Sequence, residues 1–215
     1  MNRTKKLVVL LLSFIMLLSI SVNATEVESQ GTIGIIDFSN IENNPNVSVS
    51  EVLTFSEMVE RYAKNAGITY WEALEMFPNA SSTYSARGVY YREFTVTLDV
   101  DKKYKPSLKF YCETAEGGNF RNINAIYSVQ LVREYNGKSK QFSGDIQVWL
   151  RNTYAIEYVV NGDFYNNGTT TFSGGGNGKF GIAEIIDLTF TASFTYVSNH
   201  YKYFYVHDTA VYGAG

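Results

Sequence analysis

Residues 186–196 read Ile-Asp-Leu-Thr-Phe-Thr-Ala-Ser-Phe-Thr-Tyr, with apolar and polar side chains in strict alternation. Because successive side chains of a β-strand point to opposite faces, this period of two predicts a strand with one face buried and the other in solvent. Similar alternation recurs in four earlier runs: 94–100, 108–112, 142–150 and 154–160. Turn-forming pairs such as Asn136-Gly137 separate the runs. The pattern predicts roughly seven or eight antiparallel strands over residues 88–212.

The composition supports the same fold class. The chain of 215 residues is 45% hydrophobic and 15% aromatic, with 17 Tyr, 14 Phe and only 3 Pro. Such a chain is too apolar for disorder, and its aromatic residues favour strands. We therefore expect a mainly β protein built as an antiparallel β-sandwich. Alternation alone fits a meander β-barrel equally well, so that alternative stays open.

A two-helix hairpin is predicted ahead of the β-domain, over residues 54–78. Thr54 and Glu57 have the spacing of a capping box. In this motif the threonine hydroxyl accepts a hydrogen bond from the backbone N–H of the glutamate, and the glutamate carboxylate accepts one from the backbone N–H of the threonine. Gly67 suits the left-handed residue that ends a helix. Apolar residues recur between them at helical spacing: Phe55, Met58, Val59, Tyr62, Ala63 and Ala66. A second capping box, Thr69 with Glu72, begins a shorter helix that Pro78 ends.

Residues 25–53 are interpreted as an N-terminal segment and linker. Within them, 33–38 is a short apolar run that fits a strand, and 40–50 is rich in Asn and Ser and reads as a linker. The hairpin that follows is acidic, with five acidic and two basic residues between Glu51 and Pro78. Together with a formal net charge of −3, this sign of charge argues against a nucleic-acid partner.

Residues 1–24 have the three parts of a secretory signal peptide. A basic start with Arg3, Lys5 and Lys6 precedes an apolar run over 7–20, and small residues lead to Ala24. The apolar run is about fourteen residues long, short of the roughly 20 that a membrane span needs. We therefore expect cleavage after Ala24, a secreted extracellular product, and no membrane span after cleavage.

In the order of its parts the chain resembles a group of small secreted proteins of Gram-positive bacteria, classed as a family of unknown function. The resemblance lies in the signal peptide, in the acidic helical hairpin and in the Tyr- and Thr-rich β-region that follows. In the hairpin it is carried by Tyr62-Ala63, Gly67-Ile68-Thr69 and Glu72-Ala73. It implies an extracellular role and supplies no catalytic residues.

The sequence offers no recognisable reaction centre, metal site or cofactor site. The two histidines, His200 and His207, are seven residues apart and would lie on opposite faces of one regular strand, with no Cys or His-Glu motif beside them. The single cysteine, Cys112, falls on the apolar side of its strand, so we expect a buried, inert thiol. Asp99 and Asp101 precede two lysines, which disfavours a calcium site.

Three tyrosines of the last predicted strand are the candidate ligand-binding residues. Tyr201, Tyr203 and Tyr205 alternate with Phe204 and Val206. If the latter two face the core, three phenol rings line the outside, where they suit stacking on a sugar or contact with a protein surface. Ordinary cross-strand packing is the other reading of these rings.

The leading hypothesis is a secreted, non-enzymatic binding module of the bacterial cell surface or its surroundings, with a cell-wall glycan or a surface protein as partner. A second hypothesis is a secreted hydrolase acting on polysaccharide or peptide, which needs two acidic residues facing one hollow. A third is a secreted antagonist or toxin-like effector.

Overall fold

The computed structural model describes residues 34–38, 44–77, 89–118, 120–174, 177–194 and 199–213. The chain divides into two compact units, Met1–Gly31 and Thr32–Gly215, and every described residue belongs to the second. The predicted signal peptide, residues 1–24, therefore lies outside the described residues.

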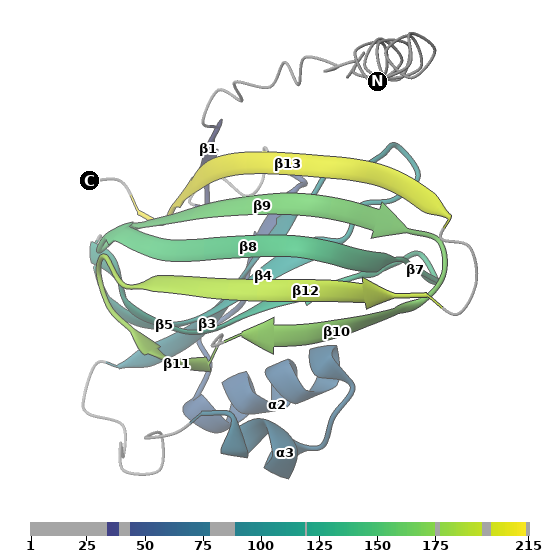
Figure 1. The fold of residues 1–215 in the computed structure, drawn as a ribbon. Helices are drawn as coiled ribbons and strands as arrows, with labels where there is room; N and C mark the ends of the chain where they lie inside the picture. The colour runs from purple at the N-terminus through teal and green to yellow at the C-terminus, as the bar shows by residue number, and fades with distance from the viewer. Residues whose placement is uncertain are drawn as a thin grey trace, which may run out of the picture. The chain divides into compact units, whose positions relative to one another are not determined.

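Two large sheets contain most of the strands (Figure 1). The six-stranded sheet has, from edge to edge, β1 (Gly34–Asp37), β13 (His200–Val211), β9 (Ala155–Tyr165), β8 (Gln141–Asn152), β12 (Ile185–Ser193) and β10 (Thr169–Gly174). The five-stranded sheet has β11 (Asn177–Phe180), β5 (Phe120–Val132), β4 (Ser107–Gly117), β3 (Tyr90–Thr97) and β2 (Val47–Val49). A separate ribbon pairs β6 (Glu134–Tyr135) with β7 (Lys138–Ser139).

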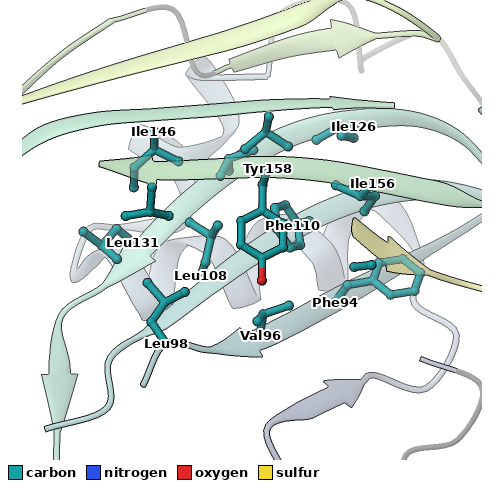
Figure 2. Packing of buried hydrophobic residues seen from close by; sticks show 14 of the residues in the cluster. Phe94, Val96, Leu98, Leu108, Phe110, Ile126, Leu131, Ile146, Ile156 and Tyr158 are labelled. Atoms are coloured by element: carbon teal, nitrogen blue, oxygen red, sulfur yellow. The ribbon is translucent and has the colours of Figure 1, made fainter. Parts of the chain in front are cut away.

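The two large sheets pack face to face around one hydrophobic core. Side chains from both sheets interdigitate there, as Figure 2 shows for Phe94 and Phe110 of one sheet and Ile146 and Tyr158 of the other. The rings of Phe110 and Tyr158 lie 5.7 Å apart. Each sheet ends in two different edge strands and does not close on itself. The prediction of a mainly β sandwich is confirmed, and the barrel alternative is wrong.

The helices α2 (Phe55–Ala66) and α3 (Tyr70–Glu75) form a third layer on the outer face of the five-stranded sheet. Both predicted capping boxes are present, at Thr54–Glu57 and Thr69–Glu72. Gly67 ends α2 with φ of 70°, a left-handed conformation that costs glycine nothing. These signals are local, which is why the sequence predicts them.

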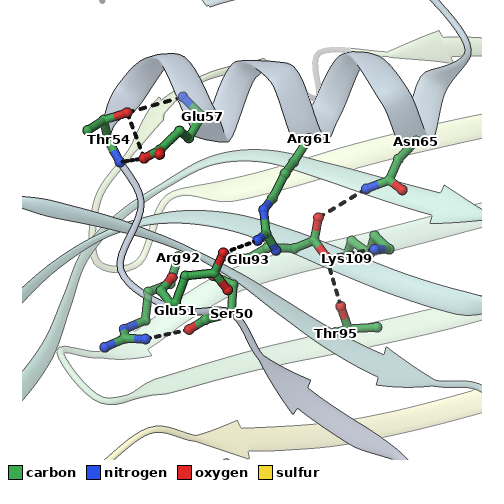
Figure 3. Close-up of polar contacts among 10 residues, drawn as sticks. All are labelled: Ser50, Glu51, Thr54, Glu57, Arg61, Asn65, Arg92, Glu93, Thr95 and Lys109. Carbon is green, nitrogen blue, oxygen red and sulfur yellow. Dashed lines mark hydrogen bonds and ion pairs between the residues drawn. The ribbon is translucent and has the colours of Figure 1, made fainter.

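A polar network joins α2 to the sheet beneath it (Figure 3). The amide of Asn65 donates to the Glu93 carboxylate at 3.0 Å and to the Tyr111 hydroxyl at 2.8 Å. Lys109 Nζ lies 2.6 Å from Glu93 Oε1. Glu93 is only 8% exposed, so these partners replace the water that its charge has lost.

The N-terminal residues contribute more to the sandwich than the sequence predicts. The expected strand over 33–38 is present as β1, and it pairs in parallel with β13. The linker reading of 40–50 is wrong for Val47–Val49, because these residues form β2 and pair with β3. Three residues are too few to give a periodic signal. Eleven of the strands in the described part of the chain follow Val89, more than the expected seven or eight, since β6, β7 and β11 are only two to four residues long.

Candidate functional site

The face of the six-stranded sheet that points away from the core is its open face. The helices pack on the other sheet, and alternate residues along the strands here are exposed or half-buried. The strand registers place these residues in rows that cross the sheet. Its central members are Asp187 and Thr189 on β12, Asp145, Gln147 and Trp149 on β8, Glu157, Val159, Asn161 and Asp163 on β9, and Tyr203, Tyr205 and His207 on β13.

Two of the predicted tyrosines lie on the open face. Tyr203 is 44% exposed and Tyr205 is 37% exposed. Tyr205 lies opposite Asn161 in the register, and the Tyr203 hydroxyl donates to Asn161 Oδ1 at 2.9 Å. Phe204 and Val206 point the other way and pack against the core, which meets the condition stated for these tyrosines in the sequence analysis. The phenol rings are therefore presented to solvent with one of them fixed by an amide.

Tyr201 does not share this face. A bulge between His200 and Lys202 interrupts the pairing of β13 with β9, and Tyr201 packs against the core beside the buried Tyr104 at 5.9 Å between ring centroids. Lys140 Nζ lies 3.6 Å from the centre of the Tyr201 ring. The expectation that all three tyrosines share one face is wrong because a bulge adds a residue that simple alternation does not count.

A hollow of about 390 Å³ lies on the open face, over the middle of the sheet. Its lining includes Asp145, Gln147, Asn161, Asp187 and Thr189. The Thr189 hydroxyl donates to Asp145 Oδ1 at 2.8 Å. Among the described residues no lysine, arginine or histidine forms an ion pair with Asp145 or Asp187. The hollow thus offers carboxylate, amide and hydroxyl groups to a polar ligand.

Both histidines face the same side of the sheet, contrary to the expectation of opposite faces. The bulge accounts for the change, since His200 Nε2 lies 2.7 Å from Asp163 Oδ1 and His207 Nε2 lies 2.8 Å from Glu157 Oε1. The ring of Trp149 lies 6.2 Å from that of His207. Each histidine is therefore held by its own carboxylate in a separate pair.

The remaining candidate residues from the sequence are buried or have partners within the protein. Cys112 is fully buried, which confirms the predicted burial, and burial raises the pKa of its thiol, which disfavours the reactive thiolate. Asp99 pairs with Lys105 at 2.5 Å, and Asp101 accepts a hydrogen bond from the Lys103 backbone at 3.0 Å. In the part of the chain that the structure describes, no three His, Cys, Asp or Glu side chains are grouped to hold a metal ion.

Sequence reasoning missed the polar residues of the hollow. Asp145, Asn161 and Asp187 are the polar members of alternating runs, so their outward direction follows from the period of two. Their proximity does not, because β8 lies between β9 and β12 only through the sheet topology. Strand order is the missing information.

Comparison of the chain with protein-family models, with curated proteins and with solved structures finds no match. Within the described residues, no helix has the length and apolar character to cross a membrane. The open face is therefore interpreted from its own chemistry.

Proposed function

We propose that this chain is a secreted, non-enzymatic binding module of the bacterial cell surface or its surroundings, and that a glycan binds on the open face. The basic and apolar composition of residues 1–24 supports export. The observation that carries the proposal is the pair of exposed rings, Tyr203 and Tyr205, beside a polar hollow.

The chemistry of the open face suits a sugar. A pyranose ring has apolar C–H faces and a rim of hydroxyl groups, so it needs an aromatic surface together with donors and acceptors at its edge. Tyr203 and Tyr205 provide the aromatic surface. Asn161 and Gln147 provide amides that can both donate and accept, and Asp145 provides an acceptor. An extended face of this kind also suits a chain of sugars rather than a single one.

The test is binding to immobilised cell-wall polysaccharide and to a glycan array. We expect the double variant Tyr203→Ala/Tyr205→Ala to lose binding by about tenfold or more, because two stacking contacts are removed. Trp71→Ala is the matched control, since Trp71 is an exposed aromatic residue (71%) on the helical layer. Binding by the double variant at the level of the parent would reject the open face as the site, as would equal loss in Trp71→Ala.

A hydrolase is the second candidate, because Asp145 and Asp187 line the same hollow. Two carboxylates flanking one bond are the requirement for glycoside hydrolysis. Both side chains are exposed, however, whereas the general acid of such enzymes is usually held in an apolar environment. Release of reducing ends from cell-wall polysaccharide, abolished in Asp145→Asn and in Asp187→Asn, would replace the binding module with this enzyme.

A further inference from the structure

A second cavity is lined by residues of α2, β5, β10 and β12, which Figure 1 labels. Its volume is about 350 Å³, within the range of small-molecule pockets. Its lining shares no residue with the hollow on the open face. The residues that matter here are Tyr62, Gln130, Arg133, Phe172 and Phe190.

Arg133 is held in place from one side of its guanidinium. Its Nη1 donates to the backbone carbonyl of Lys140 at 3.0 Å, to Gln141 Oε1 at 2.7 Å and to Thr170 Oγ1 at 3.2 Å. The carbonyl of Arg133 itself accepts a hydrogen bond from the Tyr104 hydroxyl at 2.6 Å. The side chain is therefore pre-organised, and little conformational entropy remains to be lost on binding.

The other side of the same guanidinium is unused. In the described part of the chain, no carboxylate forms an ion pair with Arg133, and neither Nε nor Nη2 has a hydrogen-bond acceptor. Neither nitrogen is among the buried polar atoms that lack a partner, so both are accessible to solvent. Burial lowers the pKa of Arg133, yet a guanidinium stays charged in proteins. The Nε and Nη2 edge is the one that matches the two oxygens of a carboxylate.

An apolar wall accompanies this charge. Phe172 is 47% exposed on β10, and its ring lies 5.2 Å from that of Phe190. Large apolar side chains exposed beside a binding cavity mark a contact for an apolar group. The acidic residue of the lining, Glu134, is exposed, and its Oε1 accepts a hydrogen bond from the Gly137 backbone at 3.2 Å. Glu134 is not paired with Arg133.

We infer that this cavity binds an organic anion with an apolar body, and that its carboxylate pairs with Nε and Nη2 of Arg133 while its hydrocarbon part packs on Phe172 and Phe190. The ligand chemistry follows from the two halves of the lining, one cationic and pre-organised, the other aromatic and exposed. Two sources share this chemistry: a free aromatic or aliphatic acid, and the C-terminal carboxylate of a peptide with an apolar last residue.

The test uses isothermal titration calorimetry of the full chain with hydrocinnamate and with its neutral amide, hydrocinnamamide. We expect the acid to bind at least about tenfold more tightly, because a charge-assisted bidentate contact is lost in the amide. This comparison needs no variant and therefore does not depend on folding of a mutant. Equal binding of hydrocinnamate and hydrocinnamamide would overturn the proposal, as would no binding of hydrocinnamate or of a second acid, acetyl-phenylalanine.

Variants then assign the contact. Arg133→Gln should weaken binding of hydrocinnamate by about tenfold or more, and Phe172→Ala should weaken both acid and amide. Arg151→Gln and Phe120→Ala are the matched controls, since these side chains are exposed elsewhere. Loss in the controls equal to that in the cavity variants would reject the site. Acetyl-phenylalanine serves as the peptide-terminus probe: tighter binding of it than of hydrocinnamate assigns a peptide source, and the reverse assigns a free acid.

Discussion

The outer faces of the two sheets use similar residues for different purposes. On the five-stranded sheet, the covered face lies under α2 and α3, and its tyrosines Tyr111 and Tyr127 are 0% and 6% exposed. On the six-stranded sheet, the open face presents Tyr203 and Tyr205 at 44% and 37%. A tyrosine in a strand is therefore a weak indication of function unless it is known whether another layer of the fold covers it. The helical hairpin makes one face structural and leaves the other available to a ligand.

Carboxylates differ between the faces in the same way. On the covered face Glu93 and Glu113 are 8% and 7% exposed, and each has a lysine and a tyrosine or amide as partner. Burial and the nearby Glu113 charge raise the pKa of Tyr127, because an anionic phenol beside a carboxylate in a dry interface is unfavourable. On the open face Asp145 and Asp187 are exposed, and neither forms an ion pair with another described residue.

The largest expected difference in the free energy of unfolding comes from truncating one tyrosine side chain on each face to alanine. Tyr111→Ala should lower the free energy of unfolding by about 4 kcal/mol, because it removes a fully buried ring against Tyr62 and leaves Asn65 and Gln130 without their shared partner. Tyr205→Ala should cost less than about 1 kcal/mol. Urea denaturation measures both, and equal losses would remove the distinction between the faces.

Breaking one ion pair on each face should give a smaller difference. Glu93→Gln should cost about 2 kcal/mol, since it leaves Lys109 charged and mostly buried at the helix–sheet interface. Asp163→Asn, which breaks the pair with the exposed His200, should cost less than about 1 kcal/mol. Raising the salt concentration should leave the effect of Glu93→Gln largely unchanged, because that pair is mostly buried. A reversed order would contradict the buried network in Figure 3.

The sequence predicted what depends on neighbours along the chain. The capping boxes at Thr54 and Thr69 and the alternation over 186–193 each rest on a few adjacent residues, and each gives the element that the structure contains. Residues 195 and 196 of that alternating run lie outside the described residues. Strand order, the short β2 and the bulge before Lys202 depend on contacts distant in the sequence. Strand order and the bulge decide which tyrosines and aspartates meet on the open face, so the candidate site was predictable only in part.

Acidification should affect the half-buried carboxylate of Glu116. Burial raises the pKa of Glu116, but hydrogen bonds from Arg92 and Thr114 outweigh it, so the pKa is lowered overall. Arg92 contacts both carboxylate oxygens, at 2.5 and 2.6 Å. A lowered pKa contributes stability that is present above the unfolded-state value of about 4.3 and lost as pH falls through the folded-state value. Urea denaturation from pH 7 downwards should therefore show the parent and Glu116→Gln converging in stability below about pH 4; a constant difference would contradict this.

The smallest effect on stability is expected where the effect on binding is of most interest. Tyr203→Phe removes only the hydroxyl that donates to Asn161, in a position where water can replace it. The free energy of unfolding should change by less than about 0.5 kcal/mol. If a glycan uses the fixed Asn161 amide, the dissociation constant for cell-wall polysaccharide should rise about fivefold, since one net hydrogen bond is worth about 1 kcal/mol. Tyr154→Phe, at 38% exposure in the turn before β9, is the control and should change neither quantity. A Tyr203→Phe variant that binds like the parent would confine the role of this ring to stacking. A variant that unfolds more readily would show that the Tyr203 hydroxyl stabilises the fold, as the buried tyrosines of the covered face do.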